Sequence, residues 1–215
     1  MEQTQQIKII DRVSLTKDGL FVKGTKQEIH LQQGSLDGAC AVYSMMMCLI
    51  MSKVIKRKEI TDLGFCHDGR KSKGRLVRLF LEHRGFIRKG YYFKDLQSDL
   101  NKAFRSKINS ICYYENERTS LVDDIIEALQ NNLPVEIGFT RKGNKNGHAV
   151  VAIGYQEFNN SVSFFCLDPG FDLPKGQFWN NILQVNTDST AKYNCINNQE
   201  ESFVAIDEIL IIEPK

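Results

Sequence analysis

Apolar and polar side chains alternate through the first part of the chain, roughly from residue 7 to residue 31. A period of two is typical of half-buried β-strands, and Lys17-Asp18-Gly19 lies between two such stretches. An Asp-Gly pair between alternating stretches predicts a β-hairpin. His30 stands alone near the end of this region, and we interpret it as a structural residue.

The most apolar run extends from Cys40 to about Ser52 and follows a polar loop that contains Gly34 and Gly38. Its residues are apolar in nearly every direction around a helical wheel, which predicts a helix buried in the middle of the domain. The run is too short to span a bilayer. A cysteine is therefore expected at the first turn of a buried helix.

Beyond this helix, the pattern predicts further helices followed by strands. Helices are expected over 74–85, over 93–104 and after Thr119-Ser120, and strands over 107–114, 135–139, 148–155, 162–167 and 203–212. The polar segment 53–72 and the Asn-rich segment 171–200 are predicted to be mostly loops. The segments 53–75 and 171–200 are expected to shape substrate access or to act as lids. Helices followed by an antiparallel sheet predict an α+β fold. We expect one domain over 32–215, preceded over 1–31 by a hairpin extension or pro-segment.

The composition is that of an ordinary globular protein, with 42% hydrophobic residues, 25% charged residues and a net charge of +2. This charge is too small to indicate nucleic acid or an anionic membrane as a partner. The N-terminus lacks the charged-then-apolar pattern of a secretion signal, so a cytoplasmic protein is expected. Oligomeric state is not specified by any pattern in the chain.

The six cysteines show no C-x-x-C pair. Cys48, Cys112 and Cys166 lie in apolar or strand-like runs and are predicted to be small core residues. Cys66-His67-Asp68, with His83 nearby, does not form the paired ligand pattern of a structural zinc site. No metal site is therefore predicted.

Three residues carry candidate chemistry: Cys40, His148 and Asp168. The helix N-terminus favours a thiolate at Cys40. His148 stands at the first position of a predicted buried strand, and Asp168 ends the strand expected to pair with it. A hairpin between these strands would bring His148 and Asp168 to the same end, where the acid can orient the imidazole toward a thiol.

These motifs resemble the papain-like cysteine peptidase superfamily: a glutamine before Asp37-Gly38-Ala39-Cys40, then Asn146-Gly147-His148, then Leu167-Asp168-Pro169. The chain is most similar to bacterial branches with an Asp as third member, such as the peptidases that cut double-glycine leaders from bacteriocin precursors. The resemblance implies a papain-like fold in which a buried N-terminal catalytic helix packs on an antiparallel sheet.

By the same resemblance, Cys40 is the nucleophile, His148 the general base and acid, and Asp168 its orienter. The oxyanion-hole glutamine is Gln33 or Gln32, which lie seven and eight residues before Cys40, whereas six is usual in these enzymes. A one-residue insertion near Asp37-Gly38 would account for the longer spacing.

The implied reaction is hydrolysis of a peptide bond in a protein or peptide substrate through a thioester, without a metal or organic cofactor. Two alternatives remain open. The same residues would serve a deamidase or a transglutaminase-type acyltransferase. A papain-like fold can also be kept as a catalytically silent binding module, although such a copy needs none of the three residues.

Overall fold

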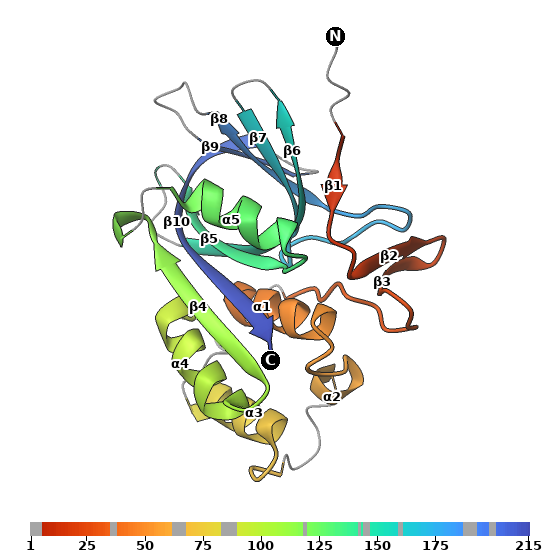
Figure 1. The fold of residues 1–215 in the computed structure, drawn as a ribbon, viewed down its shortest axis with the longest axis vertical. Coiled ribbons are helices and arrows are strands. Elements are labelled where there is room, and N and C mark those ends of the chain that lie inside the picture. The colour runs from red at the N-terminus through yellow and green to blue at the C-terminus, as the bar shows by residue number, and fades with distance from the viewer. Residues whose placement is uncertain are drawn as a thin grey trace.

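Strands β5 to β10 pair into a closed ring, to which β1 and β4 add at the sides (Figure 1). The computed structural model describes residues 6–34, 38–61, 68–82, 90–117, 120–141, 143, 147–158, 161–186, 193–197 and 201–215. All the pairings between strands in this part of the chain are antiparallel. The strands are β1 Lys8–Ile9, β2 Val13–Thr16, β3 Gly19–Val22, β4 Ile108–Tyr114, β5 Val135–Arg141, β6 Gly147–Phe158, β7 Ser161–Leu167, β8 Asn181–Asn186, β9 Tyr193–Asn197 and β10 Glu201–Pro214.

Helix α1, Cys40–Met51, is the buried centre of the molecule. It packs against β6 and β5, and the Ser44 hydroxyl donates to the carbonyl oxygen of Ala149 over 3.1 Å. Its residues from Met45 to Met51 are at most 4% exposed. The expected helix is therefore confirmed, including its first residue.

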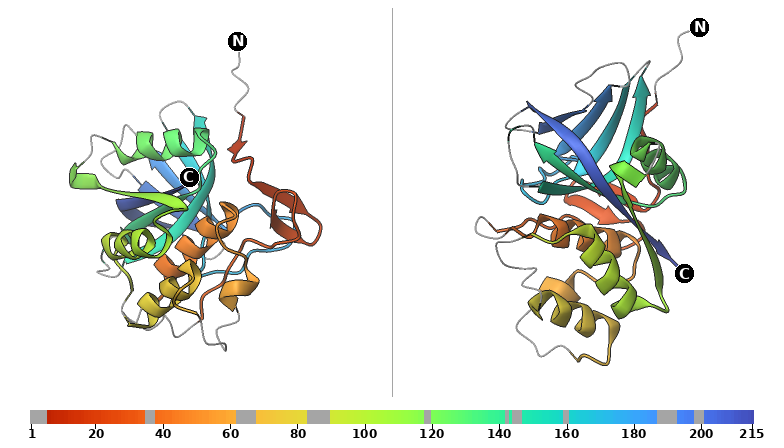
Figure 2. Two further views of the ribbon diagram at one scale, coloured as in Figure 1. Left: turned by 60° about the horizontal axis from the view of Figure 1, so that its bottom comes forward. Right: turned by 90° about the vertical axis from the view of Figure 1, so that its left-hand side faces the viewer.

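The remaining helices are α2 Lys58–Thr61, α3 Ser72–Glu82, α4 Phe93–Phe104 and α5 Leu121–Gln130, and a 3-10 turn spans Glu115–Glu117. Helices α1, α3 and α4 lie at one end of the strands, and α5 lies on another side of them (Figure 2). Ser120 caps α5 by accepting a hydrogen bond from the backbone N–H of Asp123. The mixed α+β class, with an early helix packed on an antiparallel sheet, is confirmed.

Two segments predicted to be loops contain regular structure. The segment 53–72 includes α2, and the segment 171–200 includes β8 and β9. In β8 the side chains of Leu183 and Val185 are buried, while Gln184 between them is half-buried. This alternation was obscured by the Asn-rich composition, and pairing with β7 and β9 supplies the stabilisation that local propensity lacks.

The N-terminal segment forms the predicted hairpin, with β2 pairing β3 across Lys17-Asp18. Strand β1 also pairs β6, through Lys8 with Tyr155 and Ile9 with Gly154. Leu20, Val22 and Ile29 are at most 1% exposed and belong to the same core as α1. The assignment of 1–31 as an extension or pro-segment stays a prediction.

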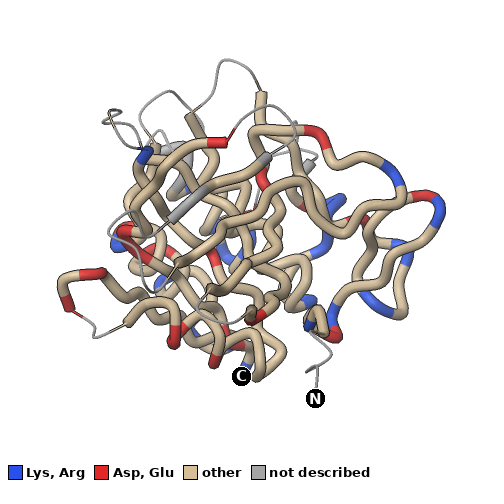
Figure 3. The backbone as a smooth tube through the Cα atoms, turned by 90° about the horizontal axis from the view of Figure 1, so that it is seen from above, with Lys and Arg blue, Asp and Glu red and all other residues tan. Residues whose placement is uncertain are grey.

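Lys and Arg positions are interspersed with Asp and Glu positions along the described backbone (Figure 3). Within the described ranges, no helix has the length and apolarity needed to cross a membrane.

Candidate active site

Cys40 is the first residue of α1, and its side chain is half-buried. The preceding residue, Ala39, offers no side chain to cap the helix, so the first backbone N–H groups of α1 receive no hydrogen bond from an N-cap side chain. Helix N-termini favour negative charge, on a thiolate or on an oxyanion. The sequence therefore places a thiol at a position that stabilises anions.

His148 is the second residue of β6, and its imidazole reaches both Cys40 and Asp168. Its Nε2 lies 2.7 Å from Oδ1 of Asp168, and its side chain also hydrogen-bonds the Cys40 side chain. The ring of Phe139, directly across the β5–β6 ladder, meets the imidazole edge-on with centroids 5.5 Å apart. The register of these strands therefore sets the position of the imidazole.

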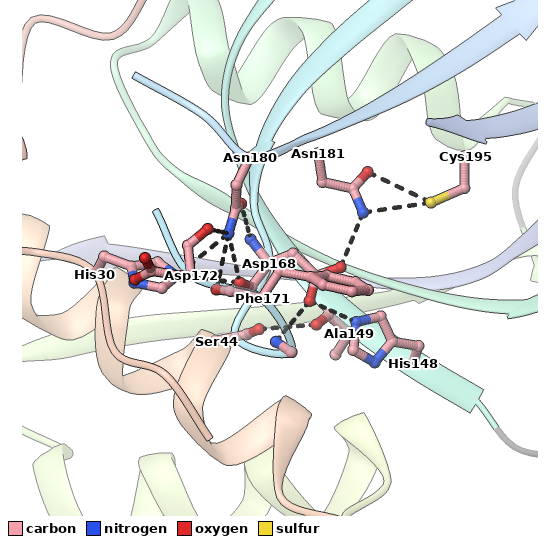
Figure 4. A network of polar contacts seen from close by, with 11 residues as sticks. His30, Ser44, His148, Ala149, Asp168, Phe171, Asp172, Asn180, Asn181 and Cys195 are labelled. Atoms are coloured by element: carbon pink, nitrogen blue, oxygen red, sulfur yellow. Dashed lines mark hydrogen bonds and ion pairs between the residues drawn. The ribbon is translucent and has the colours of Figure 1, made fainter. Parts of the chain in front are cut away.

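Asp168 follows the last residue of β7 and is completely buried. Besides His148, its Oδ1 accepts the backbone N–H of Gly170 over 2.7 Å, and its Oδ2 accepts the side-chain amide of Asn181 over 2.8 Å (Figure 4). Both carboxylate oxygens thus have donors, which holds the group in one orientation. The predicted hairpin of β6 and β7 does bring His148 and Asp168 to the same end.

The opposite charges of His148 and Asp168 stabilise each other. Burial alone would lower the pKa of His148, but the hydrogen bonds and charges of Asp168 and Cys40 outweigh it and raise that pKa to about 10. Burial alone would raise the pKa of Asp168, but its bonds to His148, Gly170 and Asn181 lower it. The favoured state is an imidazolium next to a carboxylate.

Asn180 and His30, which were not predicted from the sequence as site residues, hydrogen-bond the backbone of Asp168. The Asn180 side chain bonds both backbone groups of Asp168, accepting its N–H over 2.7 Å and donating to its carbonyl over 2.9 Å. His30, buried as an uncharged ring, donates Nε2–H to the same carbonyl over 3.0 Å. Burial lowers the pKa of His30. Asn180 and Asn181 belong to a segment predicted to be a loop, so no local pattern marked them.

Gln33 lies in the same cleft as Cys40, whereas Gln32 is exposed. The backbone N–H of Gln33 donates to the carbonyl of Pro169 over 2.8 Å, which ties this loop to the turn after Asp168. Its Oε1 is buried and has no hydrogen-bond partner in the described part of the chain. The tertiary structure thus favours Gln33 over Gln32. Asp37, where an insertion was predicted, lies outside the described residues.

A cleft of about 690 Å³ opens onto these groups. Its lining includes Gln33, Gly38, Cys40, Gly147 and His148. A substrate segment placed there would contact the thiol, the imidazole and the start of α1 together.

The structure describes some of the other cysteines and histidines named in the sequence analysis, but not all of them. Cys48 and Cys166 are buried as expected, and Cys112 is half-buried. Burial, its largest influence, raises the pKa of the Cys112 thiol to about 11. Cys66, His67 and His83 lie outside the described residues. Among the residues that are described, no three His, Cys, Asp or Glu side chains gather as a metal site would require.

One family of known proteins matches most of this chain. The sequence model of a family described as the "Peptidase_C39 like family" matches residues 21–201. Among solved structures, the crystal structure of UfSP from C. elegans aligns with a TM-score of 0.44 and 13% identity, covering 100% of this chain and 35% of that one. The chain thus spans about a third of that protein's length. No curated protein matches the sequence.

Proposed function

The chain belongs to the Peptidase_C39-like family of papain-like cysteine peptidases, and from this premise we propose that it hydrolyses a peptide bond through Cys40, His148 and Asp168. The observation that carries the proposal is the continuous contact from Asp168 through His148 to Cys40, at the mouth of a cleft. We propose a protein or peptide as the substrate.

The reaction begins with an ion pair. His148 takes the thiol proton of Cys40, and the thiolate is stabilised by the imidazolium and by the start of α1. The thiolate attacks the substrate carbonyl carbon, and a C–S bond forms while the carbonyl oxygen becomes an oxyanion. Asp168 keeps the imidazole oriented throughout, because its two oxygens are fixed by other donors.

The oxyanion is stabilised by the backbone N–H of Cys40 and the side-chain amide of Gln33. A donor of this kind contributes about 3–4 kcal/mol to transition-state stabilisation. His148 then gives its proton to the leaving amine as the C–N bond breaks. Water, deprotonated by His148, hydrolyses the thioester and restores the thiol.

Two other functions use the same site differently. An amine acceptor in place of water would give transamidation, and a glutamine side-chain amide as substrate would give deamidation. A silent binding module would not need the donors that surround both oxygens of Asp168. We therefore place peptide hydrolysis first.

The test combines thiol reactivity with product analysis. We would measure alkylation of Cys40 by iodoacetamide between pH 4 and pH 9 in the wild type, His148→Ala and the control Cys112→Ser. We expect rapid alkylation at pH 6 in the wild type and the control, and a loss of about tenfold or more in His148→Ala. A profile with the usual thiol pKa of about 8.5 that His148→Ala leaves unchanged would refute the catalytic assignment.

Products then separate the reaction types. A peptide library digested in H₂¹⁸O should yield new C-termini that carry ¹⁸O in the wild type and none in Cys40→Ala. Conversion of glutamine to glutamate, or cross-linked peptides without new termini, would instead assign deamidation or transamidation.

The choice between the two glutamines has its own test. Gln33→Ala should lower kcat/KM about 100-fold, because an oxyanion donor is lost, while Gln32→Ala should leave it unchanged. The reverse order would assign the oxyanion hole to Gln32.

A further inference from the structure

One part of the wall of the cleft beside Cys40 has no role in the proposed hydrolysis. This part is acidic and aromatic: Asp207, Glu208, Tyr91, Tyr92 and Tyr114. Among the described residues that line the cleft, none is a lysine or arginine. The imidazolium of His148 also lines the cleft but is paired with Asp168, so the negative charge of Asp207 and Glu208 faces this space without a lysine or arginine beside it in the described lining.

A β-bulge brings the two carboxylates together. The β10–β5 register shifts between Ile206 and Glu208, so that Asp207 is the extra residue. Bulges re-aim side chains and are frequent next to active sites. Without the bulge, successive residues of β10 would point to opposite faces. Here Asp207 and Glu208 are both half-buried and both line the cleft.

Neighbouring groups hold both carboxylates in place. Thr140 donates its hydroxyl to Oδ2 of Asp207. The backbone N–H of Phe93, the first residue of α4, donates to the Glu208 side chain. Gly138 lies beneath Glu208, and a Cβ built there would come within 2.9 Å of the Glu208 Cγ. A larger residue at position 138 would therefore force the Glu208 side chain to shift.

A third carboxyl lies close to this pair, on β5. Glu136 lies two residues before Gly138 on β5, and so on the same face of the strand. It is completely buried, and neither of its oxygens has a hydrogen-bond partner in the described part of the chain. Its electrostatic interactions include Glu208 and Cys40. Burial, and then the charge of Asp207, raise the pKa of Glu208 to about 7. A bound cation would stabilise the ionised carboxylate and so oppose this shift.

We propose that this acidic and aromatic lining is a substrate subsite for the side chain of a lysine or arginine close to the scissile bond. The tyrosine rings can cover the apolar stem of such a side chain and interact with its cationic end, which the two carboxylates bind. The inference rests on the proposed function and adds a specificity to it.

The experiment uses peptidyl vinyl sulfones, which alkylate an active-site thiolate without requiring turnover. Lysine would be placed in turn at each of the three positions before the reactive group, and compared with norleucine, which has a similar length and no charge. Labelling rates of Cys40 would be followed by mass spectrometry in the wild type, Glu208→Gln, Asp207→Asn and the control Glu213→Gln. Glu213 lies on the same strand, is exposed, and does not line the cleft.

We expect lysine to be preferred over norleucine at one position by about tenfold or more, the usual scale for a charge-assisted hydrogen bond. Glu208→Gln and Asp207→Asn keep the acceptors for Phe93 and Thr140, and should each reduce the preference several-fold. Glu213→Gln should leave it unchanged.

The labelling rates distinguish failure of the subsite proposal from failure of the proposed function. Rapid labelling with no lysine preference at any position, or a preference that survives both variants, would overturn the subsite and leave the peptidase assignment intact. Labelling of Cys40 no faster than that of glutathione would refute the proposed function, and the subsite with it.

Discussion

Asn181 donates a hydrogen bond from its side-chain amide to Oδ2 of Asp168 over 2.8 Å, with both side chains buried. The same amide group also contacts Sγ of Cys195 on β9. The first residue of β8 therefore fixes the carboxylate that orients His148. A segment whose composition suggests a loop is thus part of the support of the site.

Replacing this amide should weaken both the fold and the site. Asn181→Ala leaves Oδ2 of a buried carboxylate without its donor, so we expect the free energy of unfolding to fall by about 2 kcal/mol. The alkylation rate of Cys40 at pH 6 should also fall. Urea denaturation and iodoacetamide labelling check the two effects. Asn109→Ala, at an exposed position of β4, is the control. Equal behaviour of the two variants would contradict the support role.

The raised pKa of His148 predicts a pH dependence of stability. We would use Cys40→Ser, so that this thiol does not titrate, and add Asp168→Asn. Above the unfolded value of about 6.5 the unfolded chain loses the imidazole proton while the native protein keeps it. The contribution of the Cys40 thiol to the raised pKa of His148 is absent from Cys40→Ser, and the contribution of Asp168 remains. The stabilisation by Asp168 is thus complete below pH 6.5 and is lost as the pH rises through the raised pKa of His148.

The measurement is urea denaturation at pH 6, 7, 8 and 9. The free energy of unfolding of Cys40→Ser should decline more steeply with pH than that of the double variant, by up to about 1.4 kcal/mol per pH unit. Subtracting the two profiles cancels the titration of other groups. Parallel profiles would show that Asp168 does not hold the proton on His148.

Glu136 is expected to lower the stability of the protein. It is completely buried, and burial raises its pKa well above the usual range. Glu136→Leu should increase the free energy of unfolding at pH 8 by about 1–3 kcal/mol, because a desolvated carboxyl without a partner in the described chain is removed.

The raised pKa of Glu136 also predicts how the effect of Glu136→Leu on stability depends on pH. Above the unfolded value of about 4.3 the unfolded chain gains stability by ionising at Glu136. The advantage of Glu136→Leu should therefore be larger at pH 8 than at pH 4, and Glu136→Gln should show less of it. A loss of stability in Glu136→Leu at pH 8 would assign this carboxyl a partner.

Gly154 allows β1 to lie against β6. A Cβ built at this position would lie 2.4 Å from the Lys8 carbonyl oxygen and 2.4 Å from Cδ1 of Ile9. Gly154→Ala should therefore displace β1 and lower the free energy of unfolding by about 1–3 kcal/mol. Hydrogen exchange at Ile10, whose N–H donates to the Ile153 carbonyl, should become faster.

The control for this substitution is Gly69→Ala, because a Cβ at Gly69 meets nothing within 4 Å. If Gly154→Ala matched Gly69→Ala in stability and in exchange, then β1 would not contribute to the fold. Such a result would favour interpreting residues 1–31 as a separable segment.

The sequence by itself determined the elements whose side chains repeat with a clear period. Helix α1 is apolar all round and follows a glycine-containing loop, so its first residue, Cys40, could be placed correctly. The long buried strand that begins beside His148 and the turn at Asp168-Pro169 were likewise marked by local composition. Local patterns of this kind were therefore sufficient to propose Cys40, His148 and Asp168 together.

Only the tertiary structure decided which groups surround these three residues. Asn180, Asn181 and His30 reach Asp168 through strand pairing and core packing, interactions between positions far apart in the chain that no local period records. The difference in burial between Gln33 and Gln32, on which the proposed choice between them rests, likewise depends on where the loop lies against Pro169. The bulge that turns Asp207 and Glu208 into the cleft arises from the pairing of β10 with β5, since register is a property of two strands and not of either sequence alone.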